Sequence, residues 1–101
     1  MGLTQEVANY VFKVSYKDIP SEVIRLARGF VLDGLGVALA GSTDDCSRIV
    51  QAHVLEIGGK QECAVLGTVL STPAPKAALA NGVAGHAMDY DDTQLSTSKE
   101  A

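Results

Sequence analysis

One long segment after Pro20 constrains the fold of this chain more than any other feature. It reads SEVIRLARGFVLDGLGVALAG and closes on Gly41. Because proline is tolerated in the first turn of a helix and glycine is typical of its end, the segment predicts one long helix. Its first half is amphipathic, with Arg25 and Arg28 among apolar residues, whereas its second half is apolar on nearly every side. A helix that is apolar all round is buried, so we expect other polypeptide to surround the second half.

Asp33 is the exception within this apolar half. Its helical neighbours one turn away are Gly29, Phe30, Gly36 and Val37. None of them is a cation, and an unpaired buried carboxylate is costly. We therefore expect Asp33 to be satisfied by the backbone or by an arginine of another segment.

Three further helices and a short extended pair complete the predicted fold. Thr4 caps a first helix that frays near Ser15, a third covers residues 43–59, and a fourth starts near Pro75. Between the last two, the β-favouring runs CAVL and TVLS flank Gly67. The fold class is thus mainly α, about four helices with a short β-hairpin or extended pair before the last helix, part of a larger all-helical domain. A two-stranded ribbon is not stable alone, so it must lie on the helices.

The last helix is rich in small residues, which allow a second helix to approach closely. Glycines inside a helix each cost about 1 kcal/mol relative to alanine, so we expect close packing to compensate for them. Two stripes of small residues are candidates for the packed face: Ala78, Gly82 and Gly85, or Ala80, Ala84 and Ala87.

The composition fits one small globular domain. The chain has 101 residues, of which 47% are hydrophobic, and carries a net charge of −4. It has no basic stripe and no glycine-rich phosphate loop, so no nucleic-acid partner is expected. No apolar segment is long enough to span a bilayer, and the N-terminus lacks the pattern of a secretory signal. We expect no membrane association and a cytoplasmic location.

The cysteines and histidines do not indicate a metal centre. Cys46 and Cys63 lack neighbouring ligands at metal-binding spacing, so buried free thiols are expected in place of a zinc or iron–sulfur site. His53 has no second ligand three or four residues away, and we interpret it as a packed or surface side chain.

The stretch HAMDYDDT places three carboxylates at the end of the last predicted helix. Acids there oppose the negative end of the helix dipole and repel one another, so local stability does not explain them. Three interpretations remain open: a solvated acidic end, a divalent-metal site made by Asp89, Asp91 and Asp92, or a catalytic corner whose basic residues come from outside the chain. If the helix persists, Asp89 and Thr93 point the same way, with His86 one turn earlier.

At these residues the chain resembles a known family. ALANGVAGHAMDYDDT is similar to the signature of the MmgE/PrpD family, and the Pro-led segment ending in GVALAG and the AVLGT run agree with it. The family includes 2-methylcitrate dehydratase, cis-aconitate decarboxylase and iminodisuccinate epimerase. The resemblance implies that residues 1–101 are the N-terminal portion of the family's helical domain, with the rest of that domain and a second α+β domain absent.

The resemblance also implies roles for individual residues. Asp89 maps onto a catalytic position and Thr93 onto a pocket-lining one, so we expect Asp89 to transfer a proton and Thr93, Asp92 and His86 to bind substrate. The family supplies a nearby histidine and downstream Lys, His and Tyr residues that cannot be mapped here, and Lys99 matches no family position. No cofactor and no metal are expected.

The expected function is that of an N-terminal fragment of an MmgE/PrpD-type lyase, inactive alone. Its substrate would be a small tri- or dicarboxylate, as in 2-methylcitrate dehydratase. The resemblance implies a homo-oligomer, a dimer, for the full-length protein. The alternatives are a non-catalytic helical interaction module, or a cis-aconitate decarboxylase or epimerase member of the family.

Overall fold

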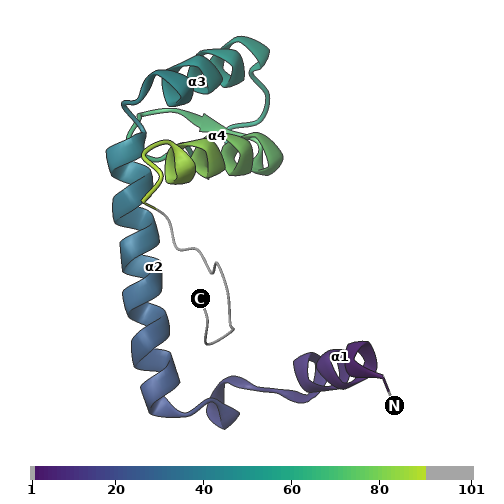
Figure 1. Ribbon diagram of the computed structural model, residues 1–101. Coiled ribbons are helices and arrows are strands. Elements are labelled where there is room, and N and C mark those ends of the chain that lie inside the picture. The colour runs from purple at the N-terminus through teal and green to yellow at the C-terminus, as the bar shows by residue number, and fades with distance from the viewer. Residues whose placement is uncertain (1, 91–101) are drawn as a thin grey trace. The chain divides into compact units, whose positions relative to one another are not determined.

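A computed structural model describes residues 2–90 of the chain, and the description that follows concerns those residues (Figure 1). The elements in chain order are α1 (Leu3–Lys13), a 3-10 turn η1 (Tyr16–Asp18), α2 (Ser21–Gly41), α3 (Asp45–Ile57), β1 (Cys63–Ala64), β2 (Ser71–Thr72) and α4 (Ala74–His86). The prediction of a mainly α fold with four helices and an antiparallel strand pair before the last one is confirmed. None of the described helices has the length and apolar character needed to cross a bilayer.

The chain divides into two compact units, residues 1–31 and residues 32–101. The first unit begins with α1, whose N-cap is Gly2, so the predicted start at Thr4 was too late. The helix ends where the Val14 N–H donates to the Tyr10 carbonyl, 2.9 Å away. Neither α1 nor η1 contains a buried residue.

The turn η1 is held by a reciprocal cap. Both the backbone N–H and the hydroxyl of Ser15 donate to one carboxylate oxygen of Asp18, over 2.9 and 2.8 Å. These two hydrogen bonds lower the pKa of Asp18 below its ordinary value of 3.8, and the bond from the Ser15 hydroxyl has the larger effect. The cap orients the chain for α2, where the Pro20 carbonyl accepts from the N–H groups of Val23 and Ile24.

The second half of α2 is far less buried than the sequence predicts. Of its residues only Ala38 and Gly41 are buried. Phe30 is 61% exposed and Leu32 72% exposed, and Asp33 is also exposed. The prediction of an enclosed helix with a partnered Asp33 is therefore wrong for the described residues, because none of them covers this part of α2.

The core of the second unit is small and aliphatic. Val54 of α3, Val65 after β1 and Ala80 of α4 are each at most 3% exposed, and Val50 and Leu70 pack against them. In Figure 1 α3 and α4 lie one over the other with the strand pair beside them, in agreement with the contacts between these elements.

Alanines, not glycines, form the packed face of α4. Ala77, Ala80 and Ala84 are buried, so of the two predicted stripes the one through Ala80 and Ala84 is the packed one. A Cβ added at Gly82 or Gly85 would meet nothing within 4 Å. The expected compensation by close packing at these glycines is therefore absent among the described residues.

The strand pair is short and closely tied to α4. Cys63 pairs with Thr72 and Ala64 with Ser71 in antiparallel register. Gly67, in the loop between the strands, has a φ of 76°, and a Cβ there would overlap the Ser42 side chain. Glycine is therefore required at Gly67 both by the turn and by the close approach.

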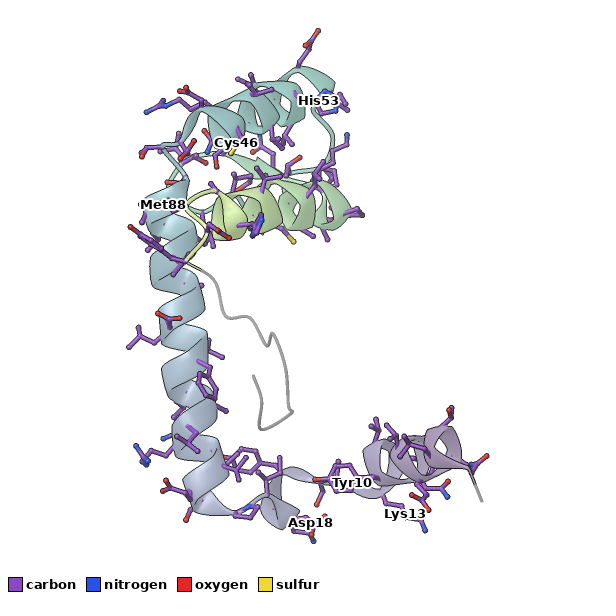
Figure 2. All side chains as sticks on the ribbon, viewed as in Figure 1. Tyr10, Lys13, Asp18, Cys46, His53 and Met88 are labelled. Carbon is purple, nitrogen blue, oxygen red and sulfur yellow. The ribbon has the colours of Figure 1, made fainter. Side chains whose placement is uncertain are left out.

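The two thiols are less buried than predicted. Cys46, in the first turn of α3 (Figure 2), is exposed, and Cys63 is half-buried. Cys46 lies near the start of α3, where the helix dipole favours a negative group such as Asp44, and its Sγ is 3.9 Å from a carboxylate oxygen of Asp44. The prediction of two buried thiols is wrong.

Candidate functional site

The acidic stretch begins in a turn, because α4 ends at His86. The Ala87 N–H donates to the Ala84 carbonyl over 3.4 Å, and the Asp89 N–H donates to the His86 carbonyl over 3.0 Å. Both bonds span three residues, which is the tightened pattern of a helix end. The condition for the predicted stripe, a helix that persists beyond Asp89, is therefore not met.

Asp89 itself adopts a left-handed backbone conformation, with a φ of 56°. It is the only residue other than glycine with positive φ among residues 2–90. Aspartate and asparagine tolerate this conformation better than other side chains with a Cβ, because their short polar groups interact locally with the backbone. The left-handed residue breaks the helical path of the backbone, so Asp89 marks a corner just after the end of α4. Figure 2 locates this corner by the label of Met88.

A close approach between two helix ends fixes the position of the corner. A Cβ added at Gly41, the last residue of α2, would overlap the carbonyl oxygen of Ala84 and come within 3.3 Å of the Ala87 Cβ. The sequence identified Gly41 only as a helix stop. The structure gives it a second role, because only a residue without a side chain allows α2 to end against α4.

A buried hydroxyl strengthens the same junction from α3. Ser47 is 1% exposed, and its hydroxyl donates to the Gly41 carbonyl over 2.6 Å. The neighbouring Ser42 hydroxyl donates to the Leu39 carbonyl over 2.7 Å. Both carbonyls lie at the end of α2, where they also accept from the backbone N–H groups of Ser42 and Asp44. Three helices therefore support the corner at Asp89: the end of α2 packs against α4, and Ser47 of α3 binds the end of α2.

Asn81 is a residue whose importance the sequence did not reveal. It belongs to the ANG triplet of α4, and its side-chain oxygen accepts from the Leu66 N–H over 2.9 Å. Its amide nitrogen donates to the Ala64 carbonyl over 3.1 Å. The amide thus imitates a strand partner and ties the strand pair to α4. A polar residue on the inward side of an alanine-rich helix was the available signal.

The predicted site residues divide into two groups. His86 and Asp89 are described, and both are exposed, as is Tyr90 at 70%. Asp92 and Thr93 lie outside the described residues, so the expected common direction of Asp89 and Thr93 stays a prediction.

The charge around Asp89 is one-sided. No described lysine or arginine forms an ion pair with it. His86 occupies the last turn of α4, where the helix dipole favours a cation. The corner can offer a carboxylate to a ligand, but cationic groups able to hold an anionic ligand must come from elsewhere.

The metal interpretation concerns residues that the structure describes only in part. Residues 2–90 contain no cluster of three or more His, Cys, Asp or Glu side chains suited to a metal ion. The proposed ligand set combined Asp89 with Asp91 and Asp92, and these last two lie outside that range. The hypothesis stays a prediction.

Comparison with known proteins gives one family and several relatives. The family model for the MmgE/PrpD N-terminal domain matches residues 5–99. A cis-aconitate decarboxylase-like protein of Aspergillus oryzae is 29% identical over 91 residues, which is 90% of this chain and 19% of that protein. Human cis-aconitate decarboxylase is 28% identical over 93 residues, 91% of this chain and 19% of the human protein. The mouse enzyme gives the same identity and coverage.

The chain therefore spans about a fifth of the length of these curated relatives, 19% in each case. No solved structure matches the chain.

Proposed function

Since the chain belongs to the MmgE/PrpD family, matched over residues 5–99, we propose that it forms the N-terminal part of a lyase acting on a small tricarboxylate. The observation that carries the proposal is the corner at Asp89. There a carboxylate stands in a left-handed turn that three helices support through Gly41 and Ser47. A carboxylate whose backbone is placed in this way is suited to proton transfer.

Decarboxylation of cis-aconitate is the reaction that the relatives favour. All three relatives named above are cis-aconitate decarboxylases or similar to them. In such a reaction a C–C bond breaks, CO2 leaves, and the remaining electron pair is neutralised by a proton on carbon. In the proposed mechanism Asp89 holds or delivers that proton, while Thr93, Asp92 and His86 bind the carboxylates or hydroxyl of the substrate.

The dehydration of 2-methylcitrate is the alternative within the same family. It requires a base to remove a proton beside a carboxylate and an acid to protonate the leaving hydroxyl. The same corner could supply one of these groups. The names of the relatives support decarboxylation over dehydration, so we place dehydration second.

The proposal requires positively charged groups beyond this chain. A tricarboxylate carries up to three negative charges, and the segment from residue 86 onward has four acids against one lysine. Electrostatic stabilisation of the developing charge therefore has to come from cations outside this segment, and we propose that other polypeptide supplies them. Coverage of 19% of the relatives is consistent with such additional chain. We propose that residues 1–101 are the N-terminal portion of the helical domain.

A chimera tests this function directly. Residues 5–99 replace the matching segment of human cis-aconitate decarboxylase, and the purified, folded chimera is assayed separately with cis-aconitate and 2-methylcitrate. We expect turnover of cis-aconitate. Asp89→Asn should lower kcat at least about a hundredfold, the usual scale of a lost proton-transfer group. Asparagine suits a left-handed backbone as well as aspartate does, so the fold is preserved.

Asp45→Asn provides the matched control, because Asp45 is an equally exposed aspartate in the first turn of α3. It should leave kcat unchanged. A folded chimera that turns over cis-aconitate equally well with Asp89→Asn would remove Asp89 from the mechanism. If the chimera prefers 2-methylcitrate, dehydration becomes the favoured reaction and decarboxylation the alternative. Turnover by the 101-residue chain alone would contradict the need for outside cations.

Exposed apolar surface favours a second candidate, a non-catalytic interaction module. Phe12 of α1 is 91% exposed and Leu3 75%, and several apolar residues of α2 are exposed as well. Surfaces of this kind mark places where other polypeptide docks. If this candidate is right, the folded chimera will lack activity with both substrates.

A further inference from the structure

Residues of the segment 16–28, where η1 leads into α2, line a hollow. The course of the backbone there can be followed in Figure 1. The volume of the hollow is about 370 Å³. Three cationic side chains line it, those of Lys17, Arg25 and Arg28, together with Tyr16, Ser21 and two isoleucines. No acidic side chain is part of its lining. The hollow is thus positively charged although the chain as a whole carries −4.

The two acids nearest in sequence are occupied by other groups. Glu22 binds Arg25 through two hydrogen bonds of 2.6 and 3.1 Å. This pair lowers the pKa of Glu22 and raises that of Arg25, in each case mainly through the hydrogen bond to the other. Asp18 accepts both donors of Ser15. Glu22 therefore neutralises one of the three cations of the lining, which leaves the charges of Lys17 and Arg28.

Two of the three cations have no counter-ion in the part of the chain that the structure describes. Neither Lys17 nor Arg28 forms an ion pair with any of residues 2–90. Two like charges on one small hollow repel each other, and an anion between them would remove the repulsion. The arrangement therefore favours an anionic ligand.

We propose that this hollow binds a small multivalent carboxylate. The guanidinium of Arg28 can hold a carboxylate through two parallel hydrogen bonds, while Lys17 supplies a compact point charge for a second one. Ile19 and Ile24 provide apolar wall for the carbon skeleton that joins the carboxylates. The volume lies in the lower part of the range of small-molecule sites and exceeds the needs of a bare inorganic oxyanion. A di- or tricarboxylate satisfies both requirements.

The site belongs to the unit of residues 1–31, whereas Asp89 belongs to the other unit. The inference uses no residue of the proposed catalytic corner and does not depend on the proposed reaction. Because the net charge of the chain repels anions in general, specific binding will report on the local cluster.

The test uses the full 101-residue chain and tricarballylate, a tricarboxylate without hydroxyl or double bond that offers no group to eliminate. Binding is followed by the amide shifts in two-dimensional NMR spectra. We expect saturable shifts confined to residues 16–28, weakening as salt is added. Inorganic phosphate and acetate, titrated in the same way, should bind more weakly than tricarballylate.

Variants connect the binding to the named side chains. Lys17→Gln combined with Arg28→Gln should weaken binding about tenfold or more, equivalent to about 1.4 kcal/mol. Arg28→Lys keeps the positive charge but loses the two parallel N–H donors of the guanidinium. It should weaken tricarballylate binding, but by a smaller factor than the double variant does. Lys60→Gln serves as the control, because Lys60 is 85% exposed and lies outside the hollow. It should bind like the parent chain.

Four results would overturn the proposal. They are shifts spread over lysines and arginines elsewhere, unchanged affinity in the double variant, equal weakening in the control, and phosphate binding as tightly as tricarballylate. The last result would assign the hollow to inorganic oxyanions and not to carboxylates. Because the substituted side chains are exposed, unchanged dispersion of the remaining NMR signals will verify that the variants stay folded.

Discussion

Replacement of Asn81 separates a structural role from a catalytic one in the signature of this chain. The Asn81 amide makes one hydrogen bond as acceptor and one as donor, to Leu66 and Ala64. Each contributes about 0.5–1.5 kcal/mol, so Asn81→Ala removes about 1–3 kcal/mol. Alanine recovers about 0.6 kcal/mol of helix propensity, which leaves a net loss of about 0.4–2.4 kcal/mol in the free energy of unfolding.

Asn81→Asp gives a sharper test because it is isosteric. The new carboxylate keeps the acceptor for the Leu66 N–H, but it sets a charged oxygen against the Ala64 carbonyl in place of a donor. At about pH 7 we expect a loss at least as large as that of Asn81→Ala, about 2–3 kcal/mol, since an acceptor pair replaces a hydrogen bond. When protonated, the carboxyl can donate again, so about 1 kcal/mol should return in acid.

The direction of this pH effect follows from which state of the protein binds the proton more tightly. The folded state favours the protonated carboxyl, so its folded pKa lies above the unfolded value of about 3.9. The recovered stability is fully present below the unfolded pKa and is lost as the pH rises through the folded one. The measurement is urea unfolding by far-UV circular dichroism at about pH 7 and about pH 3.5.

Gln61→Glu is the control, because it makes the same chemical exchange on an exposed residue between α3 and β1. Subtracting the change in unfolding free energy of Gln61→Glu from that of Asn81→Asp at each pH removes the general effect of acid on the stability of the chain. If Asn81→Asp unfolds at the same urea concentration as Gln61→Glu at both pH values, the amide does not tie the strand pair to α4.

The remaining predictions concern the junction, the cap and the corner. Gly41→Ala should lower the free energy of unfolding by about 1–3 kcal/mol, because the new Cβ overlaps the α4 backbone. Gly34→Ala should raise it by up to about 1 kcal/mol, because a Cβ there meets nothing within 4 Å. Urea unfolding measures both variants, and equal effects would contradict the close approach of α2 and α4. Ser15→Ala should raise the pKa of Asp18 toward 3.8 in an NMR titration, because the variant loses the hydroxyl that donates to Asp18. In the parent chain the Asp18 carboxylate stabilises the fold at neutral pH, and this stabilisation should be lost as the pH falls through the lowered pKa. An unshifted titration would refute the cap. Asp89→Val should destabilise the chain by about 1–2 kcal/mol and Asp89→Asn hardly at all in thermal unfolding, because only the first conflicts with a left-handed backbone; identical melting temperatures would argue against that conformation.

Local signals in the sequence were sufficient to predict most element boundaries. Pro20 and Gly41 bracket α2 within one residue, because proline and glycine act through the backbone regardless of what surrounds the helix. The end of α4 was not predicted. It depends on the left-handed turn at Asp89, and aspartate adopts that conformation too rarely for a sequence pattern to indicate it.

The burial of α2 and the role of Asn81 illustrate a different limit. Periodicity reports which side of a helix avoids water, but it does not identify the segment that will cover it, and here no described segment covers the second half of α2. The Asn81 bonds link residues fifteen and seventeen positions apart, so they exist only once the strand pair has folded onto α4. The site residues stay a prediction, whereas the supports of the Asp89 corner at Gly41 and Ser47 required the tertiary structure.

The contact of Gly41 with Ala84 brings the carboxyl-terminal ends of two helices together. Each such end carries the equivalent of about half a negative elementary charge, so the two dipoles present a combined negative pole before any side chain is counted. Asp89 adds a full charge beside it. An anionic ligand could bind here only if positive groups on the facing surface balanced both the negative ends of the helix dipoles and the charge of the ligand. The electrostatic demand on the rest of the protein is thus set by the peptide dipoles as much as by the aspartates.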